Sequence, residues 1–166
     1  AGMGAVSAIS SFSLGAKQQE SLTQLIKADP WLTLNATLKQ LLPVSATGPS
    51  AEDINALAYL HQVMTVQPTE QEEKDFIIKG VGWLNGYANS EKKKAFVELT
   101  FDEKEQLLKG ISKSRAGENW INTLLGYILQ AMLAPPSYGG NTKGIGWQWL
   151  EHKAGFPLPE KGQRYF

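Results

Sequence analysis

The sequence contains no cysteine, and this absence excludes several kinds of site at once. A chain without thiols forms no disulfide, supplies no thiolate to zinc or to an iron–sulfur cluster, and attaches no c-type haem covalently. An excess of one charge is also lacking, because 16 basic residues balance 16 acidic residues. A net charge of zero gives no electrostatic reason to expect binding to nucleic acid or to an anionic lipid surface.

Histidine is scarce, since His61 and His152 are the only two in the chain. Neither is part of a His-Glu-x-x-His zinc motif, and we expect structural or surface roles for both. The glycine pairs within residues 80–82 and 144–146 lack the third glycine of a dinucleotide-binding fingerprint, and neither follows a predicted strand. The sequence therefore predicts no catalytic residue, no metal site and no cofactor-binding site in this chain.

What the chain does contain is helical periodicity. At 166 residues, with 42% hydrophobic and 19% charged residues, it is long and apolar enough for one globular domain. Apolar residues recur at helical spacing most clearly over residues 118–133, whereas no segment alternates with a period of two for long enough to form a sheet. Shorter amphipathic helices are predicted to start near Lys17, Asp29, Ser50, Thr69 and Thr100. We predict an all-α fold, an irregular bundle of about six helices.

The start of the chain differs from the rest of the sequence, because its first 16 residues are uncharged, small and apolar. The stretch is similar to the end of a signal-peptide apolar region, with residues 14–16 as a small-residue cleavage site. A flexible leader or a first helix is the alternative, and the stretch is too short and too polar to span a bilayer. We expect residues 1–16 to be a signal-peptide remnant or a flexible leader, and residues 17–166 to be a single helical domain with a tail over residues 135–166.

The composition changes again after Pro135 and Pro136, which end the last long helix. Residues 138–147 contain four glycines and an asparagine, so the backbone here can turn tightly more than once. We expect a Gly-rich turn and then an extended tail that contains aromatic residues and proline. The aromatic residues of this region are Tyr138, Trp147, Trp149, Phe156, Tyr165 and Phe166. Packing within the protein, docking to a partner protein and stacking on sugar rings are three roles that stay open for them.

The Tyr-Gly-Gly-Asn sequence of residues 138–141, followed by Gly-Trp at residues 146–147, resembles a known family. This is the gluconate 2-dehydrogenase subunit 3 family, the small or gamma subunit of the membrane-bound enzyme. Weaker support comes from Leu-Leu-Pro at residues 41–43, from a Gly-Pro-Ser-Ala turn at residues 48–51, and from residues 96–103. The candidate motif and partner-docking residues are Tyr138, Gly139, Gly140, Asn141, Gly146, Trp147 and Trp149.

The resemblance extends over residues 33–156 and includes two departures from the family pattern. Members often carry Asp-Pro just before the tyrosine, where this chain has Pro136 and Ser137. A basic residue often follows the asparagine, whereas here Thr142 follows it and Lys143 comes one place later. The departures concern which partner or sugar substrate is involved rather than the family itself.

The resemblance implies a role beside an enzyme instead of a reaction carried out by this chain. Proteins of this family accompany a large flavin-bearing dehydrogenase of the glucose–methanol–choline oxidoreductase type, often together with a multihaem cytochrome c. FAD and haem c are therefore expected in the partner subunits. Family members often bear a twin-arginine signal, so we expect export to the periplasm and membrane association through the partners.

The resulting prediction is a non-catalytic small accessory subunit of a periplasmic, membrane-associated, FAD-dependent sugar-acid or polyol dehydrogenase complex. It would aid assembly, export or stability of the flavoprotein subunit. The alternative is a carbohydrate-binding module that uses the C-terminal aromatic residues as stacking faces. A free-standing enzyme would require His152 to converge with Glu151 or Asp102 in one pocket.

Overall fold

The computed structural model describes residues 19–153, and the regular structure in this range is entirely helical. Residues 19–25 are helical, and the later elements are α2 (Trp31–Leu41), α3 (Ala56–Thr65), α4 (Gln71–Lys92), η1 (Phe96–Glu98), α5 (Phe101–Ile111), α6 (Arg115–Leu133), η2 (Pro136–Tyr138), η3 (Thr142–Gly144) and α7 (Ile145–Trp149). The all-α prediction is confirmed. The predicted leader and the tail beyond residue 153 lie outside the described residues. Over residues 19–153, no helix has the length and apolar character needed to cross a membrane.

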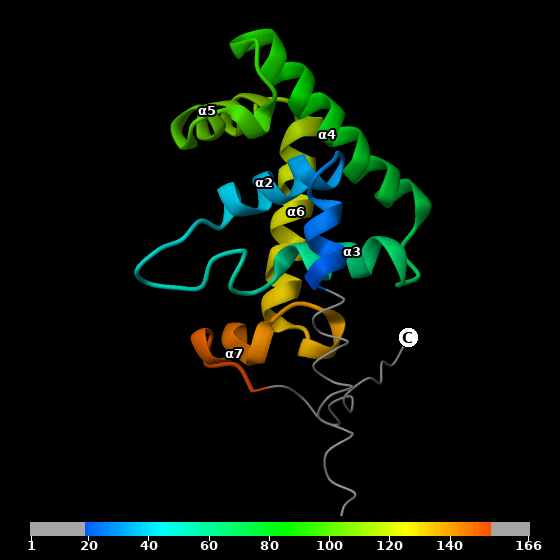
Figure 1. The fold of residues 1–166 in the computed structure, drawn as a ribbon, viewed down its shortest axis with the longest axis vertical. Coiled ribbons are helices and arrows are strands. Elements are labelled where there is room, and N and C mark those ends of the chain that lie inside the picture. The colour runs from blue at the N-terminus through cyan, green and yellow to red at the C-terminus, as the bar shows by residue number, and fades with distance from the viewer. Residues whose placement is uncertain (1–18, 154–166) are drawn as a thin grey trace, which may run out of the picture.

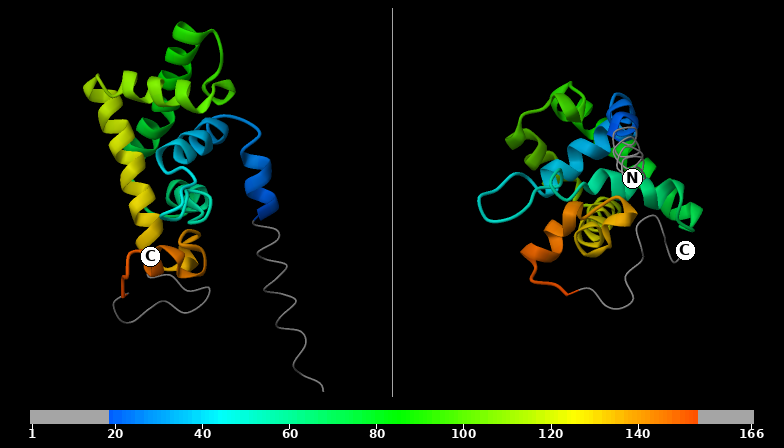
Figure 2. Two further views of the ribbon diagram at one scale, coloured as in Figure 1. Left: turned by 90° about the vertical axis from the view of Figure 1, so that its left-hand side faces the viewer. Right: turned by 60° about the horizontal axis from the view of Figure 1, so that its bottom comes forward.

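Helix α6 is the axis on which the other elements are arranged (Figure 1). It contacts α2, α3, α4, α5 and α7. Figure 2 shows α6 along one edge of the molecule, with α2, α3 and α4 on the same side of it. Its wide buried face explains this position, because these residues recur at helical spacing: Trp120, Leu124, Tyr127, Ile128, Ala131 and Met132.

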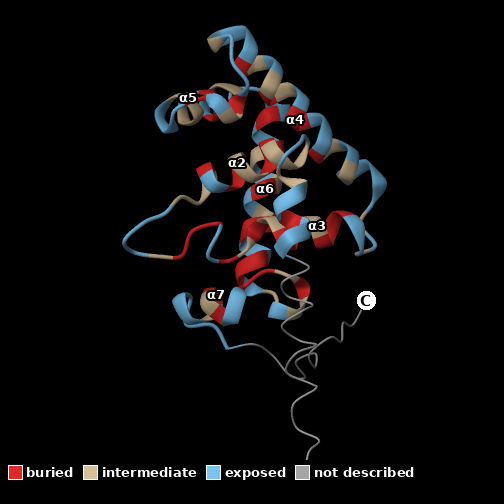
Figure 3. Ribbon diagram, in the orientation of Figure 1, coloured by how far each residue is buried: buried red, intermediate tan, exposed pale blue. Residues whose placement is uncertain are grey.

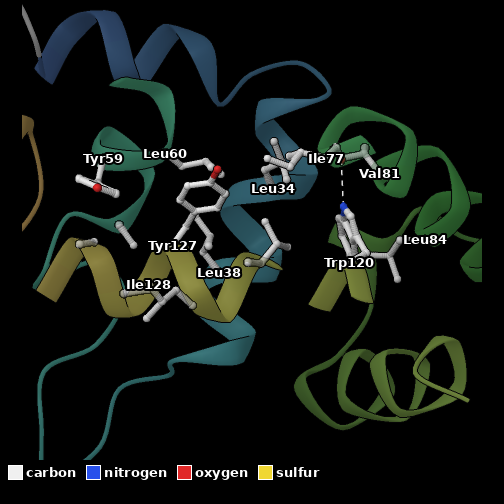
Figure 4. Close-up of a cluster of buried hydrophobic side chains, with 14 of the residues drawn as sticks. Leu34, Leu38, Tyr59, Leu60, Ile77, Val81, Leu84, Trp120, Tyr127 and Ile128 are labelled. Carbon is white, nitrogen blue, oxygen red and sulfur yellow. Dashed lines mark hydrogen bonds between the residues drawn. The ribbon is translucent and has the colours of Figure 1, made fainter. Parts of the chain in front are cut away.

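The buried face of α6 meets α2, α3 and α4 in one hydrophobic core (Figures 3 and 4). Trp120 is fully buried, and its indole Nε1 donates a hydrogen bond to the Ile77 carbonyl of α4 at 3.0 Å. Gly80 leaves the space for that indole, because a Cβ at this position would lie inside the contact distance of the ring. The glycines of α4 predict a helix break or a close backbone approach. Helix α4 continues unbroken, and the close neighbour at Gly80 is a side chain.

Two predicted helix starts show how local capping signals compete with tertiary contacts. At α5, the Thr100 hydroxyl accepts from the Glu103 N–H and the Glu103 carboxylate accepts from the Thr100 N–H, so the predicted capping box is confirmed. At α4, the predicted box of Thr69 with Glu72 is wrong. The Thr69 hydroxyl donates to the Val63 carbonyl at 3.0 Å instead, and α4 has no side-chain cap.

Helix α3 begins later than the sequence predicts. The Asp53 carboxylate accepts a 2.8 Å hydrogen bond from the Ser50 N–H, and the Ser50 hydroxyl accepts from the Asp53 N–H at 3.2 Å. These contacts match the predicted cap, and the bond from the Ser50 backbone holds the pKa of Asp53 below its ordinary value. Residues 51–55 nevertheless form turns, because Asn55 adopts a left-handed conformation with φ of 53°. The regular helix therefore starts only after Asn55.

Candidate functional site

The residues singled out by the sequence lie together at the C-terminal end of α6. Elements η2, η3 and α7 fold back beneath the last turn of that helix (Figure 1). We call residues 138–149 the clasp. Its glycines and asparagine produce the tight turns that the composition predicts, with positive φ at Gly139, Asn141, Lys143 and Gly144.

Asn141 is the residue that ties the clasp to the rest of the fold. It is fully buried, and its backbone N–H donates to the Ile54 carbonyl at 2.8 Å. Its side-chain Nδ2 donates to the Ala134 carbonyl at 2.9 Å, and its Oδ1 accepts from the Gly146 N–H at 2.8 Å. Its own carbonyl accepts from the Gly144 N–H at 2.8 Å. One residue thus joins the turn before α3, the end of α6 and the start of α7.

Gly139 and Gly140 let the clasp pass close to α3 and α6. Gly139 has φ of 95°, a conformation that side-chain-bearing residues rarely adopt. A Cβ on Gly140 would lie 3.0 Å from the Ala131 carbonyl oxygen and 3.1 Å from the Tyr59 Cβ. Glycine is therefore favoured at position 139 by its backbone conformation and at position 140 by its close neighbours on α3 and α6.

Gly146 permits an even closer approach of α7 to α6. A Cβ on Gly146 would overlap the Met132 backbone, its carbonyl oxygen above all. The backbone of α7 therefore lies directly on the last turn of α6. A short helix of this kind has little stability alone, so this contact and the Asn141 bonds hold it in place.

Trp147 and Trp149 both donate their indole N–H to backbone carbonyls. The Trp147 Nε1 donates to the Leu133 carbonyl at 2.6 Å, which satisfies an acceptor that the end of α6 leaves without a helical partner. The Trp149 Nε1 donates to the Thr47 carbonyl at 2.8 Å, and its ring packs against Gly48. The clasp therefore also braces the loop of residues 43–50.

Tyr138 is the one aromatic motif residue that lies in the core, where it is 5% exposed. A sugar-stacking residue must present its ring face to solvent, so Tyr138 does not serve as a sugar-stacking face. Trp149 is 47% exposed, but its ring edge is held by Thr47 and Gly48. The three aromatic residues of the carbohydrate-binding alternative therefore do not form one exposed platform.

The two histidines differ in their burial and in their surroundings. His61 is half-buried with its ring centroid 5.0 Å from that of Trp31, and burial lowers the pKa of His61. His152 and Glu151 are exposed at the end of α7, whereas Asp102 lies on α5 at the other end of the molecule (Figure 1). His152 therefore does not converge with Asp102, whereas His152 and Glu151 both line a hollow of about 550 Å³ beside Trp147. Over residues 19–153, no group of three acidic or histidine side chains is placed to hold a metal ion.

Sequence reasoning found the clasp but missed its partners. The Gly-Pro-Ser-Ala turn at residues 48–51 stands out in the sequence only as part of a family pattern. Trp149 bonds to the carbonyl of Thr47, the residue just before this turn and 102 positions before Trp149 in the chain. No local sequence pattern predicts a contact between residues so far apart. The Ile54 carbonyl, which accepts from Asn141, was missed for the same reason.

One comparison with known proteins gives a match. A family model described as gluconate 2-dehydrogenase subunit 3 matches residues 28–155. This range covers well over half of the 166 residues and includes the whole clasp and the loop that Trp149 braces. No curated protein and no solved structure matches the chain.

Proposed function

The chain belongs to the gluconate 2-dehydrogenase subunit 3 family, and we propose that it is a non-catalytic accessory subunit of a dehydrogenase complex. In this proposal the complex is periplasmic, is associated with the membrane through other subunits, and oxidises a sugar acid or a polyol. The chain binds the large flavin-containing subunit and aids its assembly, export or stability. FAD belongs to that large subunit, and haem c belongs to a multihaem cytochrome c subunit.

The family match over residues 28–155 is the observation that carries the proposal. The geometry of the clasp agrees with a supporting role. The backbone and side-chain polar groups of Asn141 are all engaged within the protein, and the indole N–H groups of Trp147 and Trp149 are engaged in the same way. Polar groups that already have partners within the protein are poorly placed to activate a substrate.

Co-expression with a large flavin-containing dehydrogenase subunit from the same organism tests the proposal. We expect the tagged chain to purify with the flavoprotein in a fixed ratio, and we expect more soluble, FAD-loaded flavoprotein than when the flavoprotein is expressed alone. A subunit that binds only the folded form of the flavoprotein shifts the folding equilibrium of the flavoprotein toward that form by mass action. A chain that stays monomeric beside every flavoprotein encoded near it would contradict the proposal.

Two further measurements separate the proposed roles. Deletion of the chain should leave the flavoprotein in the cytoplasm if export depends on it, whereas an exported but poorly loaded flavoprotein would indicate a role in assembly. Calorimetric titration of the isolated chain with gluconate and with sorbitol should give no heat of binding. Binding heat with a change in tryptophan emission would favour the carbohydrate-binding alternative.

A further inference from the structure

A groove of about 510 Å³ lies between α2, the loop of residues 43–50 and the start of α5. Figure 1 shows these three segments on the same side of the molecule. The apolar side chains that line the groove are Leu32, Ala36, Leu42, Val44, Val97 and Phe101. None of the clasp residues is among them, so the groove is a second feature of the surface.

Two strongly exposed apolar side chains border this groove. Val44 is 81% exposed and Phe101 is 56% exposed. Single exposed apolar residues are common on protein surfaces, but apolar residues that converge on one concavity are typical of binding sites. A ligand that covers Val44 and Phe101 would remove apolar surface from water, which favours binding.

Both walls of the groove are held in place by hydrogen bonds. On the α5 side, the capping box fixes the first turn, and the Phe101 carbonyl accepts from the Gln40 Nε2 of α2 at 3.2 Å. On the loop side, the Ala51 N–H donates to the Leu42 carbonyl at 2.9 Å and closes the loop ends. A preformed groove loses less conformational entropy when it binds a ligand.

The clasp contributes to the loop wall. Trp149 donates to the Thr47 carbonyl at 2.8 Å and packs on Gly48, while Ser45 Oγ accepts from the Gly48 N–H at 3.2 Å. These contacts fix the loop that carries Val44. The clasp therefore stabilises the loop wall of the groove through Trp149, although no clasp residue lines the groove.

The charges at the rim indicate what the groove binds. Lys39 is neutralised by Glu52, whose carboxylate lies 2.7 Å away. Lys104 lies over the Phe96 ring at 5.9 Å from its centroid, and within residues 19–153 it forms no salt bridge. The groove thus presents one unneutralised cation next to the exposed ring of Phe101.

We propose that this groove binds an apolar segment of the flavoprotein subunit, with an acidic side chain of that segment paired to Lys104. The inference rests on the proposed function, because it names the surface through which the accessory subunit holds its partner. A second copy of this chain is a poorer occupant. A symmetric dimer formed groove to groove would bring the two Lys104 side chains together, and like charges at an interface are unfavourable.

The test uses the full chain co-expressed with the flavoprotein that co-purifies with it. The double variant Val44→Ser/Phe101→Ser removes apolar surface from the rim, and Lys104→Glu reverses the rim charge. The matched controls are Leu125→Ser/Leu129→Ser, which removes exposed leucines from α6, and Lys113→Glu, an exposed residue after α5. All these side chains except that of Lys104 are exposed, so circular dichroism and melting temperature should show folded variants.

We expect the double groove variant to raise the Kd for the flavoprotein at least about tenfold. Lys104→Glu should raise it about three- to tenfold and should reduce its dependence on salt, since the attraction to an acidic partner is lost. The two controls should bind as the wild-type chain does. A folded Lys104→Glu chain that binds normally would show that no acidic group pairs with Lys104, and it would overturn the proposal.

The outcomes distinguish this inference from the proposed function. If the wild-type chain binds no neighbouring flavoprotein, the proposed function itself fails. If the wild-type chain binds and the groove variants bind equally well, while Leu125→Ser/Leu129→Ser loses binding, the accessory role stands and the groove proposal is overturned. If the wild-type chain forms dimers that the groove variants abolish, the occupant is a second copy and the proposal is again overturned.

Discussion

The clasp and the groove differ in the way they use their unusual residues. The clasp contains the most distinctive sequence of the chain, and its central residue is directed inward: Asn141 is fully buried with all of its polar groups bonded. The groove contains ordinary residues, yet it leaves Val44 and Phe101 uncovered. A distinctive motif is therefore no proof of a reactive or binding surface, because a demanding backbone path also requires particular residues.

Among the glycines of the clasp, the largest expected effect of a substitution is at Gly146. Gly146→Ala places a Cβ against the Met132 backbone, so α7 has to move away from α6. We expect a loss of about 2–4 kcal/mol in the free energy of unfolding, measured with urea. Gly126→Ala is the control, because a Cβ there meets no atom within 4 Å and should stabilise α6 by about 0.5–1 kcal/mol. Equal stability of the two variants would contradict the close contact.

The Asn141→Gly variant tests the buried hydrogen bonds separately from backbone strain. Glycine tolerates the positive φ of 47° but removes both side-chain bonds, which leaves the Ala134 carbonyl and the Gly146 N–H without their partner. We expect a loss of about 2–3 kcal/mol. Asn141→Ala should lose about 1 kcal/mol more, because alanine is disfavoured in the left-handed region. If the glycine variant is as stable as the wild-type chain, Asn141 does not tie the clasp together.

Gly139→Val tests the left-handed turn at the start of the clasp. Valine is strained at the observed φ of 95°, so the free energy of unfolding should fall by about 1–3 kcal/mol. Gly82→Val on the open face of α4 provides the comparison, since no atom lies near its Cβ position and its φ is helical. An unchanged melting temperature for Gly139→Val would show that the turn differs from the one described.

The Trp149→Phe variant tests whether the clasp stabilises the loop that borders the groove. The variant keeps an aromatic ring against Gly48 but loses the hydrogen bond to the Thr47 carbonyl, which should cost about 1 kcal/mol of stability. Because the same bond fixes the loop beside the groove, the Kd for the flavoprotein should rise about two- to fivefold. A loss of stability with an unchanged Kd would separate the clasp from the groove.

The smallest expected effect concerns His61, which belongs to neither region. Burial against Trp31 lowers the pKa of His61 in the folded chain, so the unfolded chain binds the proton more tightly. Stability should therefore fall as the pH drops below about 6.5, the ordinary pKa of histidine. His61→Gln should show less of this fall between about pH 7.5 and about pH 5.5, measured as the urea midpoint.

The sequence predicted correctly those helices whose position is determined by local residue patterns. Helix α6 follows from its apolar spacing, and the start of α5 follows from the Thr100 and Glu103 capping box. Local reasoning failed where another acceptor competed for a side chain, as when the Thr69 hydroxyl bonded to the Val63 carbonyl six residues earlier, near the end of α3.

The candidate site was predictable only in part, for the same physical reason. Glycines and an asparagine predicted a tight turn over residues 138–147, which forms most of the clasp. Its attachment to Thr47 and Ile54 depends on how distant segments meet, which no local pattern encodes. The groove was missed entirely, because α2, a loop, η1 and α5 each contribute a few ordinary residues to it.

Hydrogen–deuterium exchange of the chain, with and without the proposed flavoprotein partner, tests the central claim most directly. The clasp amides that are already bonded, such as those of Asn141 and Gly146, should exchange slowly in both states. Binding should slow exchange over residues 43–50 and 97–104, which border the groove. Protection that appears over residues 119–133 instead, with unchanged exchange at the groove, would contradict the account.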